Sequence, residues 1–166
     1  MEAAHKSFKD WHTVVHDKFK LRANDATVVD GETLSEIGTY NALLDGCTKD
    51  LYDNSVETNE SSHKLFRGTF PGGFVWEVLD VFSGPPVVGF SWRHWGRFSG
   101  KYKENVGDGQ TVQLFGFGVA TVNESLQFTN IQVYFKPDEF LQALSASAPD
   151  EDIEKIAEEL KNKSLD

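Results

Sequence analysis

A histidine set among tryptophans is the residue of this 166-residue chain best suited to proton chemistry. His94 stands between Trp92 and Trp95 in an apolar segment. An imidazole titrates near neutral pH, so a histidine in an apolar cavity can give or take a proton. The alternative is a packed histidine that is hydrogen-bonded to the backbone or to a carboxylate. We therefore treat His94 as a candidate general acid or base.

A carboxylate in a neighbouring apolar segment is the second candidate. Glu77 lies among Val75, Leu79 and Val81. Burial among apolar side chains raises the pKa of a carboxyl group, which suits it to proton transfer. The alternative is an ion pair with an arginine or lysine across a sheet. The sequence supports both equally.

Tyr40 and His63 complete the catalytic candidates. Tyr40 follows Gly38 in a predicted helix, where glycine permits close packing and the tyrosine hydroxyl is a possible proton donor to a cavity. His63 follows two serines at the start of another predicted helix. It either faces the cavity or helps to cap that helix.

Aromatic and basic residues around His94 are expected to form a ligand site. Arg93 points to the opposite side of its strand from His94, and it either pairs with Asp80 or clamps an anion or a carbonyl group. Tyr134 shares a strand face with Gln132, in a polar row that either faces solvent or contacts the ligand. The predicted ligand-binding residues are Phe90, Trp76, Trp92, Arg93 and Tyr134.

The elements that must position these residues form an α+β pattern. Val, Phe and Trp are enriched in four predicted strands, at 74–83, 87–99, 111–123 and 126–135. Residues 19–21 are a candidate for a further short strand. Apolar periodicity and capping signals predict helices over 3–15, 34–44 and 60–69 and a short helix from Pro137. A run of strands between helices favours helices packed on an antiparallel sheet.

Both faces of the predicted strands are largely apolar. Gly116 and Gly118 share one face of the third strand, a spacing that lets a sheet bend, while Phe115 and Phe117 share the other. Such a sheet needs cover on both sides. We expect helices on one face and a second subunit, in a homodimer, on the other.

Charge divides the chain into two parts. The net charge is −10, and residues 150–166 hold seven acids against three lysines, so this end contributes −4. Ile153, Ile156 and Leu160 have helical spacing there. We predict one domain over 1–149 and an acidic C-terminal helical extension over 150–166, which is either solvated or a docking helix.

Composition excludes several classes of partner. A pI near 4.9 does not suit binding to nucleic acid or to an anionic membrane. The single cysteine, Cys47, excludes a disulfide framework and a Cys-rich zinc site. No apolar run reaches membrane-spanning length, and residues 1–20 lack the pattern of a secretory signal, so we expect a cytoplasmic protein. His12 and His16 lack a third metal ligand and no phosphate loop occurs, so we expect no metal and no cofactor.

Several motifs, in the same order, resemble those of one known family. They are IGTYNALLDG at 37–46, SSH at 61–63, GFVWEVL at 73–79, SGPPVV at 83–88, WRHWG at 92–96 and GKYK at 100–103. Over roughly residues 18–144 the chain resembles the plant pathogen-related protein group. This group belongs to the SnoaL-like, or polyketide-cyclase-like, branch of the NTF2-like superfamily.

The resemblance implies a conical α+β fold in which helices cross a curved antiparallel sheet and enclose a pocket. Cyclase and isomerase relatives use such a pocket for acid/base chemistry on small cyclic substrates. They commonly carry an aromatic-Asp-Pro sequence at the end of the last strand. Here Lys136 precedes Pro137, so that carboxylate is missing unless Asp138 replaces it.

Three functions follow as hypotheses. The first is a cofactor-free isomerase, cyclase or dehydratase that acts on a hydrophobic or aromatic metabolite, with His94 and Glu77, Tyr40 or His63 as acid and base. The second is a non-catalytic, defence- or stress-related protein that binds such a metabolite. The third is a protein-interaction module. An enzyme of the first kind needs at least two titratable groups that converge on one point.

Overall fold

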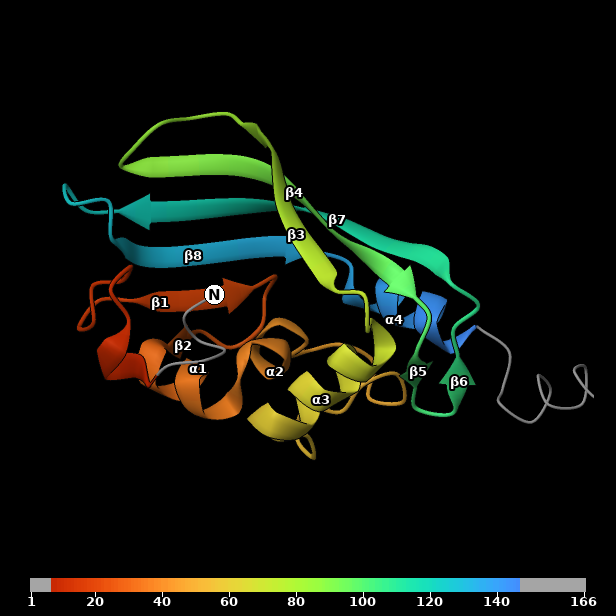
Figure 1. Ribbon diagram of the computed structural model, residues 1–166. Helices are drawn as coiled ribbons and strands as arrows, with labels where there is room; N and C mark the ends of the chain where they lie inside the picture. Colours follow the sequence, from red (N-terminus) through yellow and green to blue (C-terminus); the bar gives the residue numbers. More distant parts are fainter. Residues whose placement is uncertain (1–6, 147–166) are drawn as a thin grey trace, which may run out of the picture.

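The computed structural model describes residues 7–146, which fold into a sheet with a helical layer against it (Figure 1). The six-stranded sheet has the order β2-β1-β8-β7-β4-β3, and β5 and β6 form a separate hairpin. The strands are β1 Lys20–Ala23, β2 Val29–Asp30, β3 Phe74–Val81, β4 Val87–Phe98, β5 Lys101–Tyr102, β6 Asn105–Val106, β7 Gln110–Val122 and β8 Phe128–Phe135. The helices are η2 Phe8–Asp10, α1 Gly31–Ile37, α2 Thr39–Leu43, α3 Asn59–Thr69 and α4 Pro137–Ser145. The predicted α+β class is confirmed.

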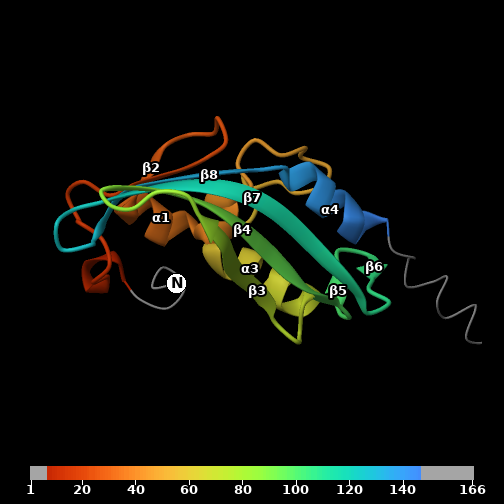
Figure 2. The ribbon, with the colours of Figure 1, turned by 90° about the horizontal axis from the view of Figure 1, so that it is seen from above.

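The four long strands match the predicted ones closely. β3 pairs with β4, β4 with β7 and β7 with β8, all antiparallel. Pro85 and Pro86, joined by a cis peptide bond, lie in the turn between β3 and β4, where neither can donate to a ladder. Figure 2 shows that β4 and β7 curve along their length, so that the sheet bends around the elements it covers.

The sheet also contains pairings that the sequence did not predict. β1 lies parallel to β8, with Leu21 opposite Ile131 and Ala23 opposite Val133. The predicted short strand around Phe19–Leu21 is therefore real, but it begins at Lys20. Parallel pairing joins segments far apart in the chain, and nothing local in the sequence marks it.

The helix predicted over 3–15 is wrong in the part that the structure describes. Only a short 3₁₀ turn, η2, forms there. The backbone N–H of Val15 donates to Phe128, and Val14 forms a bridge with the same residue, so this segment is used for strand-like pairing. Trp11 and Val14 are buried, and their spacing therefore reflects core packing rather than a helix.

The helix predicted over 34–44 is broken into α1 and α2 at Gly38. This residue has φ of 87°, a left-handed value that favours glycine. A Cβ atom there would clash with the side chain of Asn59, whose amide donates to the Ser35 carbonyl at 3.0 Å. α1 begins at Gly31, three residues before the predicted helix, and the Asp30 carboxylate accepts from the backbone N–H of Thr33 and caps it.

α3 and α4 form as predicted. Thr58 and Ser61 make a reciprocal capping box at the start of α3, and Pro137 occupies the first turn of α4. Both helices pack on the sheet through a largely aromatic cluster. Its buried residues are Leu44, Tyr52, Phe66, Phe70, Phe98, Tyr102, Val112, Phe140, Leu141 and Leu144.

The predicted extension over 150–166 lies outside the described residues. Within residues 7–146 no helix combines the length and the apolar character needed to span a membrane.

Candidate functional site

The face of the sheet that turns toward the helices is called here the inner face. Strand register places Trp76 of β3, His94 of β4 and Leu114 of β7 side by side on it. The next row holds Trp92, with Val78 and Gly116 as neighbours. The alternation predicted for β4 is confirmed, because Phe90, Trp92 and His94 share this face.

Two glycines make room for the aromatic rings of the inner face. A Cβ atom at Gly116 would overlap the indole of Trp92, and one at Gly118 would overlap the ring of Phe90. These rings therefore lie over the backbone of β7, as no other residue type would allow. The glycine spacing noted in the sequence serves ring packing at this site.

His94 is the only predicted catalytic residue that lies on this aromatic surface. Its ring centroid is 3.6 Å from that of Phe74, and its buried Nδ1 atom has no hydrogen-bond partner within residues 7–146. Burial lowers the pKa of His94 to about 4, because the charged imidazolium would lose its hydration. The imidazole is therefore neutral at physiological pH.

Trp92 carries a second unsatisfied polar group beside His94. Its side chain is only 4% exposed, and its indole N–H has no partner among the described residues. The indole packs between aromatic neighbours, with ring centroids 5.6 Å from Phe135 and 6.2 Å from Trp76. A buried polar group without a partner costs free energy, so two of them on one strand face mark a place where a bound molecule would be stabilised.

The inner face is accessible from the side of β3. Trp76 is 47% exposed although it faces the same way as His94, and Val81 is 62% exposed. Phe74 and Phe135 also belong to this surface, and sequence reasoning missed both as site residues. Strict alternation from Trp76 to Phe74 would have identified the first.

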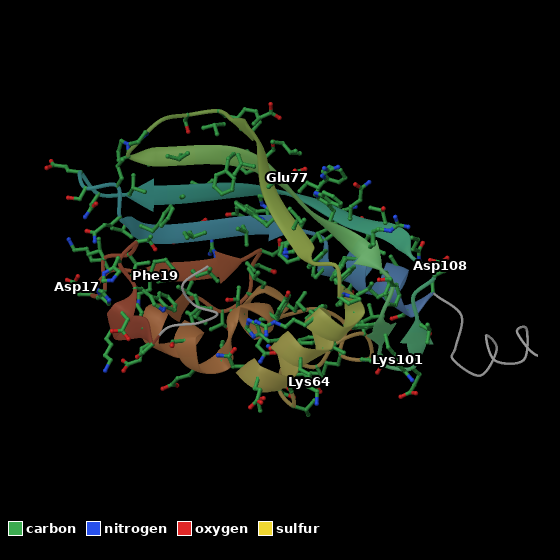
Figure 3. The ribbon with its side chains drawn as sticks, in the orientation of Figure 1. Asp17, Phe19, Lys64, Glu77, Lys101 and Asp108 are labelled. Atoms are coloured by element: carbon green, nitrogen blue, oxygen red, sulfur yellow. The ribbon has the colours of Figure 1, made fainter. Side chains whose placement is uncertain are left out.

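Glu77 and Arg93 lie on the opposite, outer face, where they form an ion pair. Arg93 donates from Nε to Oε1 of Glu77 at 2.6 Å, and its guanidinium lies 5.1 Å from the ring centre of Trp95. Figure 3 labels Glu77 on β3, far from the helix α3 that carries Lys64. Of the two alternatives for Glu77, the structure shows the cross-strand ion pair. The sheet separates this carboxylate from His94.

Arg93 forms the ion pair that was one of its predicted alternatives, but its partner is Glu77 and not the candidate Asp80. An irregularity between Val78 and Asp80 shifts the register of β3, so that Asp80 lies opposite Ser91 and accepts a hydrogen bond from its hydroxyl at 3.2 Å. The same shift places Val81, which was assigned to the face of Glu77, opposite Phe90 on the inner face. A β-bulge of this kind inverts the alternation beyond it.

Tyr40 and His63 lie together in a different place. Their ring centroids are 5.2 Å apart, and Tyr40 stacks on Phe66 at 4.2 Å. His63 uses Nδ1 for a 2.8 Å hydrogen bond with the Asn59 carbonyl of its own helix, and burial raises the pKa of Tyr40. Within residues 7–146 no hydrogen bond or ring contact joins this pair directly to His94.

The remaining predicted residue, Tyr134, lies on the outer face. It is 40% exposed, and its hydroxyl donates to Gln132 at 2.8 Å. Trp76, Phe90 and Trp92 thus share the inner face with His94, whereas Arg93 and Tyr134 do not. Of the two alternatives for the polar row of Tyr134 and Gln132, the one in which the row faces solvent therefore matches the structure.

Lys136 and Asp138 have structural partners at the start of α4. Lys136 pairs with Glu139 at 2.6 Å on the surface. Asp138 accepts from the backbone N–H and the hydroxyl of Thr48, at 2.9 and 2.5 Å, and these hydrogen bonds lower its pKa. Asp138 therefore holds the loop at Thr48. Among residues 7–146 no cluster of three or more His, Cys, Asp or Glu side chains is arranged to hold a metal.

Comparison with known proteins agrees with this fold. No family model matches the chain. A pathogen-related protein of Hordeum vulgare is 32% identical over 160 residues, a match that covers 89% of this chain and 68% of the relative. IdmH of Streptomyces antibioticus, described as a proposed polyketide cyclase, is 10% identical, with 86% of this chain and 89% of IdmH covered and a TM-score of 0.53.

A protein of Jannaschia sp. CCS1, described as a proposed SnoaL-like polyketide cyclase, has a TM-score of 0.48 and 14% identity, with 88% and 84% of the two chains covered. The predicted NTF2-like, SnoaL-like fold is confirmed, with the helices on one side of the curved sheet. The sequence match to the barley protein covers most of the chain. This chain belongs to the pathogen-related protein family.

Proposed function

We propose that this protein binds a small hydrophobic or aromatic molecule on the inner face of its sheet, and that binding is its primary function. One observation carries the proposal. Trp92 and His94 present two buried polar atoms that have no partner in the part of the chain that the structure describes, and aromatic rings lie next to them. A ligand that hydrogen-bonds to both would remove the cost of leaving them unsatisfied.

The chemistry of these groups defines the ligand. The indole N–H is only a donor, and a neutral imidazole has one donor and one acceptor nitrogen. A neutral planar molecule with a carbonyl or phenolic oxygen suits this pair, since its rings would stack on Trp76 and Phe90. A charged ligand fits less well. Within residues 7–146 the ion pair of Glu77 and Arg93 lies on the other face of the sheet, and burial alone shifts the pKa of His94, with no charged neighbour contributing.

Catalysis is the second candidate, and His94 is the observation that favours it. A neutral imidazole with an unpartnered nitrogen is able to accept a proton from a bound carbon or oxygen acid. The names of IdmH and the Jannaschia protein suggest ring-forming chemistry. Against this candidate, Glu77 lies across the sheet and Tyr40 and His63 form a separate pair, so none of the other predicted catalytic residues lies beside His94.

The name of the barley relative supports a role in defence, in which such a protein would hold a plant metabolite. A cytoplasmic location remains a prediction.

Titration with 2-naphthol, a neutral aromatic phenol, tests the binding proposal. We expect saturable binding at pH 7, and we expect Trp92→Phe to weaken it by about 2- to 10-fold, the effect of one lost hydrogen bond. Trp95→Phe is a matched control, because Trp95 also has a buried, unpartnered N–H but lies on the outer face. Equal affinities of the two variants, or no saturable binding, would contradict the proposal.

The catalytic candidate is tested separately with His94→Gln, which keeps a polar side chain but cannot transfer a proton near pH 7. With any substrate that the wild type converts, we expect this variant to bind the substrate but not to convert it. Undiminished turnover would exclude His94 as the catalytic residue.

A further inference from the structure

The inner face of the sheet ends along β3 in a row of exposed apolar side chains, called here the β3 rim. Its members are Trp76, Val78 and Val81, which stand opposite His94, Trp92 and Phe90 of β4 and are 47%, 46% and 62% exposed. The helices cover the start of β3, where Phe74 contacts Phe70 of α3 and Phe140 of α4 at centroid distances of 4.2 and 5.4 Å. Exposed apolar groups beside a buried aromatic site are typical of a surface that another segment or molecule covers.

The chain continues for twenty residues after Ala146, and it does so within reach of the β3 rim. α4 rises about 9 Å from Phe140 to Ala146, and Trp76 lies about 7 Å along β3 from Phe74. Because Phe74 and Phe140 are in contact, the end of α4 lies within about 20–30 Å of Trp76. Residues 147–166 span about 30 Å even when they are helical, so they are long enough to reach it.

The acidic end of the chain has the sequence pattern that an apolar rim requires. Ile153, Ile156 and Leu160 recur at helical spacing and form one apolar stripe, with charged residues between them. Pro149 disfavours a continuation of α4 through the residue before it, so the chain can change direction there. Residues 1–6 contain one large apolar side chain and therefore offer no such stripe.

Two cations of α3 complement the charge of this segment. Arg67 lies one turn before Phe70, at the end of α3 that packs on β3, and Lys64 is exposed one turn earlier on the same helix (Figure 3). Neither cation forms an ion pair within residues 7–146. The acidic end of the chain carries −4. An apolar stripe with acidic flanks therefore matches an apolar rim with basic residues beside it.

We propose that the segment 147–166 folds back over the β3 rim, with its apolar stripe on Trp76 and Val78 and its acidic residues toward α3. The segment completes the cover of the inner face on the side of β3, and a ligand reaches His94 when the segment moves away. Such gating segments belong to the least stable part of a fold, because they must open and close. The control of ligand access rests on the proposed function, whereas the docking of the segment does not.

Acrylamide quenching of tryptophan fluorescence in the full chain, without ligand, tests the docking. Trp76 is the most exposed of the four tryptophans, so it dominates the quenching when its ring is uncovered. Ile156→Asp places a charge in the apolar contact and displaces the segment, and we expect the quenching constant to rise about 2-fold. Asn162→Asp is the matched control, since it adds the same charge on the opposite side of the helical pattern. It leaves the quenching unchanged.

The same measurement distinguishes the segment from other occupants of the β3 rim. In a Trp76→Phe background, Ile156→Asp and its parent should quench equally, because the uncovered ring is that of Trp76. Equal quenching of the wild type and Ile156→Asp, with Trp76 in place, overturns the proposal, since the rim is then bare or covered by something else. Quenching that rises when the wild-type protein is diluted also overturns it, because a second copy then covers the rim.

Stopped-flow mixing with 2-naphthol tests the control of access separately. Ile156→Asp should bind 2-naphthol about 2- to 10-fold more tightly than the wild type, because a larger fraction of the protein is open. Asn162→Asp should bind it as the wild type does. Unchanged binding together with raised quenching overturns the control of access but not the docking. If neither protein binds 2-naphthol, the proposed function fails, and the quenching comparison still decides whether the segment docks.

Discussion

Gly116 of β7 lies against the indole of Trp92, its cross-strand partner on β4, so closely that a Cβ atom would overlap the ring. The position of Trp92 in turn determines where its unpartnered N–H lies relative to His94. One backbone contact therefore sets the geometry of the candidate ligand site. This dependence can be tested without knowledge of the natural ligand.

Gly116→Ala is expected to displace Trp92. Overpacking of this kind lowers the free energy of unfolding by about 1–3 kcal/mol, which chemical denaturation would measure. The near-ultraviolet circular dichroism of the tryptophans should change as well. Gly72→Ala is the control, because no atom lies within 4 Å of a Cβ there and its backbone is not left-handed. Equal stability of the two variants would show that the indole moves aside at no cost.

Much of the fold was predictable because its signals are local. The strands between Phe74 and Phe135 are rich in apolar residues, some of them in alternation with polar ones. The adjacent prolines at 85 and 86 mark the turn between β3 and β4. The pairing of β1 with β8 was not predictable, because it joins Leu21 to Ile131 across most of the chain. The break at Gly38 was missed because its backbone angle depends on packing against Asn59, a residue of a different helix.

The candidate site was predictable only as far as alternation reaches. Alternation correctly placed Phe90, Trp92 and His94 on one face, but it gives no register between strands. The ion pair of Glu77 and Arg93 depends on that register. The contact between Tyr40 and His63 depends on how α2 packs against α3, and the sequence does not show which faces of these two helices meet.

Glu77→Gln should leave the affinity for 2-naphthol unchanged, because the sheet separates residue 77 from His94. The ion pair with Arg93 is about one-third exposed on each side, so solvent screening limits the loss of stability to about 1 kcal/mol or less. Calorimetric titration and chemical denaturation of this variant beside the wild type check both statements. Affinity that falls as far as in Trp92→Phe would mean that Glu77 reaches the ligand site after all.

His94 should make the protein less stable in acid. Its pKa is about 4 in the folded chain and 6.5 in an unfolded one. Between these values the unfolded chain binds more protons, so the free energy of unfolding falls as pH decreases from about 6.5 to 4. The loss is at most about 3 kcal/mol, because the shift from 6.5 to about 4 is roughly 2.5 pKa units at about 1.36 kcal/mol each.

Denaturation of the wild type and of His94→Gln at several pH values between 4 and 7 measures this contribution. The free energy of unfolding of the wild type should fall steadily relative to that of His94→Gln as the pH falls, since only the wild type carries the buried imidazole. His16→Gln is a control for an exposed histidine and should follow the wild type. A constant difference between wild type and His94→Gln would mean that His94 is protonated in the folded protein without cost.

Asp138→Asn should weaken the protein without changing ligand affinity. The carboxylate accepts two hydrogen bonds from Thr48 and has a lowered pKa, so its contribution is present above pH 3.8 and is lost as the pH falls below that value. Because the group is exposed, we expect the thermal midpoint at pH 7 to fall by only a few degrees, with the free energy of unfolding lower by less than about 1 kcal/mol. Glu139→Gln removes a neighbouring surface ion pair and should have no measurable effect. If Asp138→Asn instead abolished binding of 2-naphthol at full stability, Asp138 would take the place of the carboxylate that relatives carry where this chain has Lys136.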